Sequence, residues 1–309
     1  MNQPIGLSTS WNGPGANPDR LLEQARNLGF SRIEAYAHFT LDGLRALASR
    51  AADLGMHIGS LHAPCPVASP STGDWLASPN VSESSRAVDA HKASIDAAAE
   101  LGAAAIVIHL GNSGAFSRQS TLYDTISRHG RLSDEHRLLR DSAWQEREAV
   151  KGSHLQAALT SIRALGEHAL GTGVRLGVEC RDNYVEIPSL DEFADVLEAC
   201  AGLPVGYWHD AGHGAKLDYL GFLEHEEFLK RYGDRIVGMH IHDTRDGRDH
   251  LAPGMGSTDF SMLARYLRPE TMRTLELNRM VTATEITYAL DVLEPLQVFG
   301  IREGILVSS

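Results

Sequence analysis

The sequence predicts a single (β/α)8 barrel that spans residues 1–309. Short apolar segments alternate with amphipathic helical segments along the chain, which is typical of β/α units on a parallel sheet. Eight such units can be counted, and 309 residues is a common length for one barrel of this kind. No internal repeat and no linker rich in proline, glycine or serine divides the chain. These observations together favour one domain.

The eight predicted strands are short and lack strict polar alternation, as expected for strands buried on both faces. In chain order they are Ile5–Thr9, Arg32–Ala35, His57–His62, Ala104–His109, Arg175–Glu179, Val205–Asp210, Ile236–His240 and Arg273–Leu277. Helical patterns lie between them at Pro18–Leu28, Leu41–Leu54, Ser85–Leu101, Glu146–Leu170, Ser189–Ala201 and Thr284–Phe299. Capping signals support these limits, since Asn17 and Pro18 begin the first helix and Gly29 follows its end.

A doubly wound open sheet is the alternative architecture. That fold normally carries a GxGxxG turn after an early strand, and Gly13-Pro14-Gly15 is too short a match. The barrel is therefore the preferred fold. Two connections, 64–84 and 111–146, exceed ordinary β/α loops, so we expect long loops that cover the C-terminal face of the barrel.

The composition is that of a compact globular protein, with 43% hydrophobic and 22% charged residues. No window approaches the roughly 18 consecutive apolar residues of a membrane span. The first residues, Met1–Asn12, lack the pattern of a secretory signal. We therefore expect a cytoplasmic protein without a membrane partner.

The charge and the cysteines narrow the classes of partner and site. Asp and Glu total 40 against 28 Lys and Arg, and the formal net charge of -12 disfavours nucleic acid as a partner. The cysteines, Cys65, Cys180 and Cys200, are odd in number and widely spaced, so neither a disulfide framework nor a CxxC metal site is expected.

Ionisable side chains stand at the ends of six predicted strands: His62, His109, Glu179, Asp210, His240 and Glu276. Because barrel strands end at one face, these groups are expected to gather there. Any one of them alone is more often a hydrogen-bonded polar residue at the rim than a ligand. Several buried carboxylates side by side, however, are costly without a cation among them. Imidazole and carboxylate ligands without thiolate suit Mn²⁺, Mg²⁺, Co²⁺ or Zn²⁺.

Two local motifs extend this set. Asp210 and His213 lie where a strand turns into a helix. In Met239–Asp243, the alternation places His240 and His242 on one side of an extended strand. We expect Asp243 to hold an imidazole through its second nitrogen, as ligating histidines usually require.

Further polar residues follow the strand ends. His250 precedes a glycine-containing loop, Pro253–Gly256, that is expected to close over a substrate, although an exposed loop histidine is an equal alternative. Arg181, Arg245 and Arg248 also follow strand ends. A guanidinium there is suited to bind a phosphate or carboxylate, and a salt bridge at the rim is the alternative.

The ordered motifs resemble the xylose isomerase-like TIM-barrel superfamily, within its sugar phosphate isomerase/epimerase branch. The resemblance runs from about residue 5 to 300 and is strongest over Gly173–Phe260. It is carried in order by Ser60–Pro64, Val107–Gly111, Gly177–Glu179, His209–His213, His240–Asp243, His250–Gly256 and Leu275–Leu277.

The resemblance to the ketose 3-epimerases of this superfamily implies a set of roles. One divalent ion would be held by Glu179, Asp210, His240 and Glu276. Glu179 and Glu276 would also act as acid and base on opposite sides of the sugar. The substrate would be contacted by His213 and His242, and His62, His109, Arg181 and His250 are expected to line its pocket.

Proton transfer at a carbon next to a carbonyl fits these residue types. It needs a base, an acid and an electrophile that stabilises the enediolate, and a metal ion supplies the last. We therefore expect a metal-dependent isomerase or epimerase of a sugar or sugar phosphate. A dehydratase or lyase of the same branch, and a barrel that binds a metal or sugar without turnover, stay open as alternatives. A homo-oligomer also stays open.

The superfamily also contains the type IV apurinic endonucleases, which hold three zinc ions. By that resemblance, a second metal would be held by His62, His109 and Glu179. A third would use His213 and His250 with an Asp two residues before that His, but this chain has Arg248 there and Asp249 one residue out of register. The negative net charge also disfavours DNA as the substrate. A zinc endonuclease or phosphodiesterase is therefore the second hypothesis.

Overall fold

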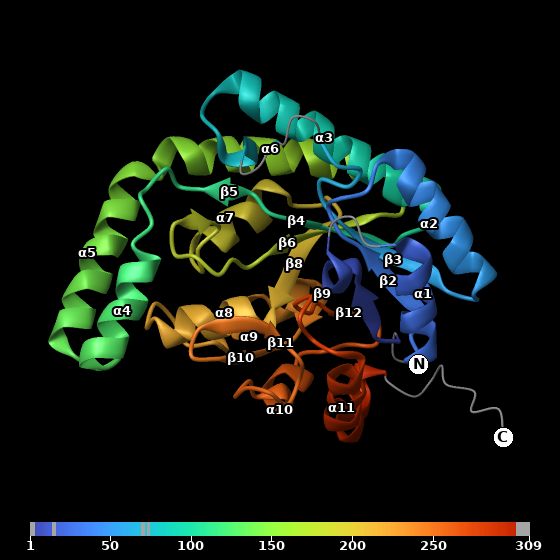
Figure 1. Ribbon diagram of the computed structural model, residues 1–309. Coiled ribbons are helices and arrows are strands. Elements are labelled where there is room, and N and C mark those ends of the chain that lie inside the picture. The colour runs from blue at the N-terminus through green and yellow to red at the C-terminus, as the bar shows by residue number, and fades with distance from the viewer. Residues whose placement is uncertain (1–3, 14–16, 69–71, 73–74, 301–309) are drawn as a thin grey trace.

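A computed structural model of the chain describes residues 4–13, 17–68, 72 and 75–300. Within these residues, eight parallel strands close into one barrel in the order β1-β12-β9-β8-β6-β4-β3-β2 (Figure 1). They are β1 (Gly6–Ser8), β2 (Arg32–Ala35), β3 (His57–His62), β4 (Ala105–Ile108), β6 (Arg175–Glu179), β8 (Val205–Asp210), β9 (Ile236–Ile241) and β12 (Met272–Leu275). The predicted (β/α)8 barrel is confirmed.

The barrel interior is closed beneath the C-terminal face by Trp208. This indole is fully buried, and the neighbouring strands carry Gly177 and Gly238 where a side chain would collide with it. A Cβ on Gly238 would lie 2.2 Å from Cζ3 of Trp208. The pairing of Trp208 with Glu179 and of Asp210 with His240 sets the polar side chains directly above this apolar layer.

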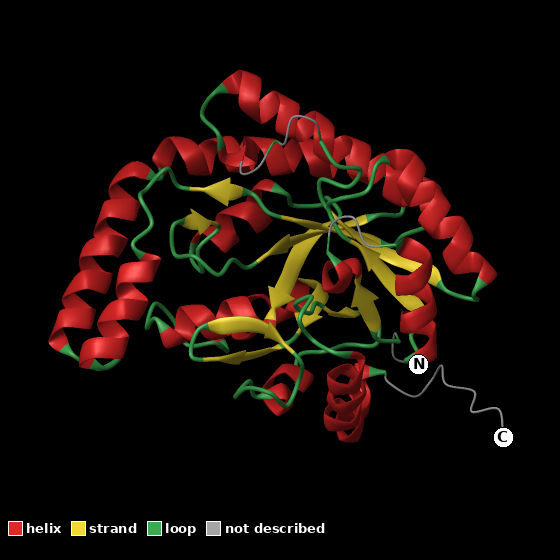
Figure 2. Cartoon of the chain, viewed as in Figure 1, coloured by secondary structure: helices red, strands yellow, loops and turns green. Residues whose placement is uncertain are grey.

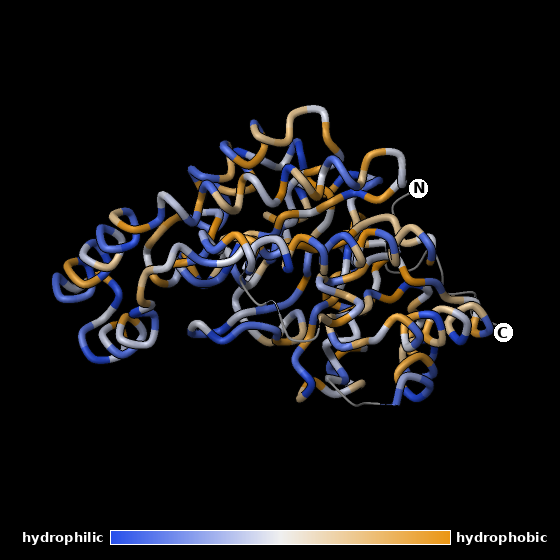
Figure 3. The backbone as a smooth tube through the Cα atoms, turned by 90° about the horizontal axis from the view of Figure 1, so that it is seen from above, coloured by the Kyte–Doolittle hydropathy of each residue, from blue (hydrophilic) through white to orange (hydrophobic). Residues whose placement is uncertain are grey.

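Helices surround the barrel (Figure 2). They are α1 (Pro18–Asn27), α2 (Leu41–Asp53), α3 (Val81–Leu101), α4 (Gln119–His129), α5 (Asp134–Val150), α6 (Gly152–Ala169), α7 (Glu192–Ala199), α8 (Ala211–Tyr219), α9 (Glu227–Tyr232), α10 (Phe260–Ala264) and α11 (Ala283–Leu293). Hydrophobic and hydrophilic residues recur in turn along the outer helices (Figure 3), as amphipathic packing on a sheet requires. Among the described helices, none combines the length and the apolar character needed to cross a membrane.

The segment 111–146 differs from the predicted loop. It contains the short strand β5 (Gly111–Asn112), helix α4 and most of helix α5. The two helices lie side by side at one edge of the molecule (Figure 1). Helix α4 buries only Leu122 and Ile126, and two of the three residues that α5 buries, His136 and Arg147, are polar, which explains why the sequence pattern suggested a loop.

Two other predicted limits also change. The predicted helix Glu146–Leu170 is two helices, because α5 ends at Val150 and α6 begins at Gly152. The predicted loop 64–84 lies partly outside the described residues; its described part contains a short 3-10 turn at Trp75–Ala77 and the first turn of α3, which Asn80 caps.

Two small antiparallel sheets lie beyond the barrel strands. In one, β5 pairs with β7 (Glu186–Ile187). In the other, β10 (Asp243–Arg245) pairs with β11 (Arg248–Leu251). Because β5 follows β4, β7 follows β6 and β10 follows β9, both sheets stand at the C-terminal face and position residues there.

Candidate functional site

Four side chains from neighbouring strands converge at the C-terminal face. Their ligand atoms all lie within 4.8 Å of one another, and the residues are Glu179, Asp210, His240 and Glu276. The Nδ1 atom of His240 is the common point: it lies 2.6 Å from Glu179 Oε1, 2.9 Å from Glu276 Oε2 and 3.5 Å from Asp210 Oδ2. All four side chains are buried. We call this set the carboxylate centre.

The electrostatics of the carboxylate centre favour a cation. Burial by itself raises the pKa of Glu179, Asp210 and Glu276, but the adjoining imidazoles outweigh it and hold all three values well below the usual range. Burial lowers the pKa of His240, yet the carboxylates of Glu276, Glu34 and Glu179 raise it well above its ordinary value. Three ionised carboxylates and one imidazole nitrogen suit a divalent metal ion.

The other nitrogen of His240 faces Glu34 on β2. Nε2 lies 3.1 Å from Oε1 and 3.2 Å from Oε2 of Glu34, and the Ser60 hydroxyl donates to Oε2 at 2.9 Å. Histidines that bind a metal through one ring nitrogen usually donate the other ring N–H to a carboxylate, which orients the imidazole. Glu34 is placed to do this for His240. From the sequence, Glu34 is expected either to line the pocket or to have a plain core or rim role; its contact with His240 was not predicted.

A second group shares Glu179 with the carboxylate centre and consists of His62, His109 and Glu179. The Nε2 atom of His109 lies 2.5 Å from Glu179 Oε2, and the rings of His62 and His109 meet edge to face at 4.6 Å. Arg181 enters this group, with Nη1 2.7 Å from both His109 Nε2 and Glu179 Oε2. Removal from water and the Arg181 guanidinium lower the pKa of His109 to about 3, so the imidazole is neutral.

A third group comprises Asp210, His242 and His250. His242 Nδ1 accepts a hydrogen bond from the His250 backbone N–H at 2.9 Å, so its Nε2 carries the proton and donates to the Asp210 carboxylate at 2.9 Å. Both nitrogens of His242 are thus engaged, Nδ1 by the His250 backbone and Nε2 by the Asp210 carboxylate. His213 lies beside this group: its backbone N–H donates to Asp210 Oδ1 at 2.7 Å and its Nδ1 to the Cys180 carbonyl at 2.9 Å.

Asp243 does not hold an imidazole, contrary to the prediction. Its buried carboxylate accepts hydrogen bonds from the backbone N–H groups of Thr244, Gly254, Gly256 and Thr258. It therefore shapes the loop that follows β11. A Cβ on Gly256 would lie 2.2 Å from the Thr244 carbonyl oxygen, so this close approach requires glycine.

A cavity of about 280 Å³ opens beside the carboxylate centre. It is lined by Tyr36, His38, His250, Glu276 and Arg279 among others, and is large enough for a small polar molecule. Of the predicted site residues, His250 and Glu276 border this cavity. Arg245 and Arg248 are exposed on the hairpin of β10 and β11 and line a different cavity.

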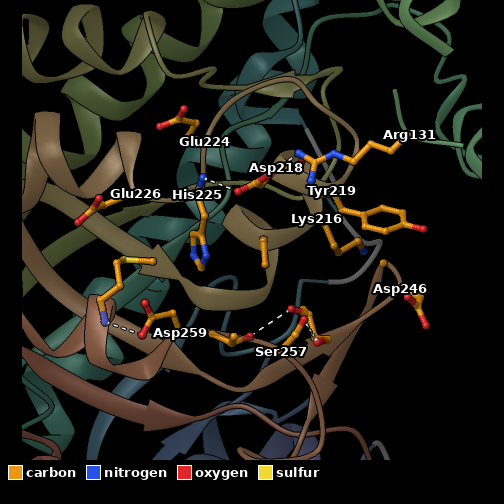
Figure 4. A pocket seen from close by; sticks show the side chains of 15 residues that line it. Arg131, Lys216, Asp218, Tyr219, Glu224, His225, Glu226, Asp246, Ser257 and Asp259 are labelled. Carbon is orange, nitrogen blue, oxygen red and sulfur yellow. Dashed lines mark hydrogen bonds and ion pairs between the residues drawn. The ribbon is translucent and has the colours of Figure 1, made fainter. Parts of the chain in front are cut away.

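A larger polar cavity, of about 660 Å³, lies between α8, α10 and the β10–β11 hairpin (Figure 4). It contains no member of the three ligand groups. Lys216 is the link between the two regions: it lines this cavity, its Nζ lies 2.9 Å from Asp249 Oδ2, and Asp249 Oδ1 lies 3.2 Å from His250 Nδ1. The position of His250 is therefore fixed from the side of the larger cavity.

Comparison with known proteins agrees with this architecture. A family model described as a xylose isomerase-like TIM barrel matches residues 22–286. No curated protein sequence matches the chain.

Several solved structures share the fold. A 3-keto-D-glucoside 4-epimerase from E. coli has a TM-score of 0.68 at 15% identity, with 95% of this chain and 100% of that chain covered. A D-psicose 3-epimerase from Clostridium cellulolyticum, solved with D-tagatose, has a TM-score of 0.64 at 13% identity and coverages of 95% and 99%. A xylose isomerase domain protein from Planctomyces limnophilus has a TM-score of 0.63 at 17% identity, with 96% of this chain and 97% of that chain covered.

Proposed function

The chain belongs to the xylose isomerase-like TIM-barrel family, and from this premise we propose that it is a divalent-metal-dependent isomerase or epimerase of a sugar or sugar phosphate. The observation that carries the proposal is the carboxylate centre beside a cavity of substrate size. Mn²⁺, Zn²⁺, Mg²⁺ and Co²⁺ all suit its three carboxylates and one imidazole. When bound, such an ion polarises a carbonyl oxygen and stabilises the negative charge of an enediolate.

The protein's own groups supply the proton transfer. Glu179 and Glu276 come from β6 and from the residue after β12, and two strands, β8 and β9, separate these positions in the barrel. Both carboxylates approach His240 Nδ1, from different sides of the barrel wall. In our proposal one of them takes a proton from the carbon next to the carbonyl and the other returns a proton, on the opposite face for an epimerase.

Other residues hold these groups in place. Glu34 orients His240, and His242 orients Asp210, through the hydrogen bonds described above. His250 borders the cavity next to Glu276 and is suited to hydrogen-bond a sugar hydroxyl. His62, His109, Arg181 and His213 are proposed to complete the polar wall.

Ketoses are the first substrates to test, because similar structures carry the names D-psicose 3-epimerase and L-ribulose 3-epimerase. The Mn²⁺-loaded protein would be incubated in D₂O with D-tagatose, D-psicose, L-ribulose and their phosphates. Proton NMR would follow replacement of a C–H proton by deuterium. We expect exchange with at least one sugar and none after the metal is removed. Failure of every sugar to exchange under these conditions would contradict the proposal.

A zinc-dependent phosphodiesterase resembling the type IV apurinic endonucleases is the second candidate. The group His62, His109 and Glu179 favours it, because it adds ligands that a one-metal isomerase does not need. The formal net charge of -12 disfavours a polyanionic substrate. Salt-sensitive nicking of a duplex with an abasic site by the zinc-loaded protein would establish this function instead.

A dehydratase that uses the same enediolate is a third candidate. In the same NMR samples it would be recognised by loss of water from the sugar.

A further inference from the structure

The Arg181 guanidinium lies among residues that otherwise have the character of a metal site. Its Nη1 atom is 2.7 Å from His109 Nε2 and 2.7 Å from Glu179 Oε2. His109 Nε2 and Glu179 Oε2 are themselves hydrogen-bonded at 2.5 Å, and with His62 these residues form one of the ligand groups. The positive group of Arg181 therefore stands beside two of the three ligand atoms that a second ion would use.

The surrounding structure holds the guanidinium in this position. Arg181 Nε donates to Glu186 Oε1 at 2.9 Å, and the other oxygen of Glu186 accepts from the Asn183 backbone N–H at 3.1 Å. Glu186 is the first residue of β7. This strand pairs with β5, which begins two residues after His109. The same small sheet thus fixes both the imidazole and the arginine, whose side chain is only 14% exposed.

The position of the guanidinium opposes the binding of a second ion. The Nη1 atom of Arg181 lies 2.7 Å from both His109 Nε2 and Glu179 Oε2, so the guanidinium occupies the side from which a second ion would approach these two atoms. A guanidinium keeps its charge at every ordinary pH, and at this distance it would strongly repel a divalent cation. Glu179 Oε2 is engaged by the same Nη1 atom, while Oε1 faces His240 in the carboxylate centre.

We propose that Arg181 replaces a second metal ion with a fixed positive charge, so that the protein binds one ion where the ligand groups alone would allow two. The inference rests on the proposed metal-dependent function and deepens it. It assigns Glu179 Oε1 to the ion and Glu179 Oε2 to the guanidinium. Arg181 therefore acts as a positioning residue for Glu179 and favours one-metal sugar chemistry over zinc-cluster chemistry.

The test compares metal content between variants. Wild type, Arg181→Ala and Arg181→Ala/His109→Ala would be loaded with excess Zn²⁺, desalted and measured by mass spectrometry of the metal against protein concentration. We expect Arg181→Ala to hold about one ion more than wild type and the double variant to return to the wild-type value. Arg118→Ala is the matched control, because it removes an arginine from a surface ion pair with Glu146 and should change nothing.

The inference is overturned if Arg181→Ala gains no ion, or if the double variant keeps the gain. Circular dichroism would establish that each variant is folded. Anomalous scattering from zinc-soaked wild-type crystals tests the same point without any substitution: an ion bound between His62, His109 and Glu179 would refute it. The gain on substitution tests the role of Arg181, whereas the wild-type content at the carboxylate centre tests the proposed function, so the two can fail separately.

Discussion

The Nε2 atom of His240 lies 3.1 Å from Oε1 of Glu34, on the opposite side of the ring from the carboxylate centre. Nε2–H donates to Glu34, so Nδ1 is the nitrogen that faces Glu179 and Glu276, at 2.6 and 2.9 Å. Trp208 supports the same ring from below, with the two ring centroids 5.0 Å apart. Glu34 on β2 and Trp208 on β8 thus set the orientation of the His240 imidazole.

Replacing Glu34 should weaken metal binding. In Glu34→Gln the charged acceptor for His240 Nε2–H is lost, and we expect about 10- to 100-fold lower affinity for Mn²⁺ because outer hydrogen-bonding partners of metal-binding histidines contribute on this scale. Isothermal titration of the metal-free protein would measure it. Glu226→Gln is the control, because it removes a carboxylate that pairs with Arg265 and belongs to none of the ligand groups. Equal affinity in Glu34→Gln and wild type would remove Glu34 from this role.

The two proposed proton-transfer groups should be individually essential. Glu179→Gln and Glu276→Gln should each abolish exchange of the substrate C–H proton with deuterium, because an amide cannot carry the proton. Metal content must be measured on the same samples, so that loss of proton transfer is separated from loss of the ion. If either variant retained exchange at the wild-type rate, that residue would not belong to the acid–base pair.

His62 and His109 should contribute to substrate binding and not to metal binding. In the double variant His62→Ala/His109→Ala, we expect a raised KM with unchanged metal content, since Arg181 already satisfies Glu179 Oε2. Steady-state kinetics and metal analysis would measure both quantities. A loss of about one ion per chain would show instead that these histidines hold a second metal.

A buried ion pair outside the site should contribute to the dependence of stability on acid pH. Arg147 binds Glu192 through two contacts of 2.6 Å, and although burial raises the pKa of Glu192, these hydrogen bonds and the charge of Arg147 lower it from 4.5 to about 2. A carboxyl with a depressed pKa in the folded state stabilises the protein above its unfolded-state pKa and loses that contribution as the pH falls toward the folded value.

The free energy of unfolding should therefore fall between about pH 4.5 and pH 2, by an amount of up to roughly 3 kcal/mol from this group. Glu192→Gln should be less stable near neutral pH and should show a smaller pH dependence in that interval. Urea unfolding at several pH values measures both. The same slope in Glu192→Gln and wild type would assign the acid sensitivity to other carboxyl groups.

The sequence was sufficient to predict the barrel and much of the centre. Each strand end is a local apolar pattern followed by a polar residue, and the closed barrel brings such ends together whatever their separation in the chain. This is why Glu179 and Glu276, almost a hundred positions apart, could be expected to lie close together. The predicted limits of β2, β3, β6 and β8 agree with the structure for the same reason.

Contacts made by particular atoms could not be read from local patterns. His240 and Glu34 are 206 positions apart, and their pairing depends on the inward direction of both side chains across the barrel. Asp243 follows a histidine, which suggested an imidazole partner. The loop after β11 instead brings the backbone N–H groups of Gly254 and Gly256 to its carboxylate. The helices α4 and α5 were missed because α4 buries only two apolar residues and α5 buries mainly polar ones, so neither shows a clear amphipathic pattern.

The central claim is that one divalent ion binds where Glu179, Asp210, His240 and Glu276 meet. A crystal grown with Mn²⁺, with data collected at the manganese absorption edge, tests it most directly. We predict one anomalous peak within roughly 2.0 to 2.3 Å of a ligand atom from each of the four side chains. The absence of a peak at this position in a crystal saturated with Mn²⁺, or an ion bound only elsewhere, would contradict the account.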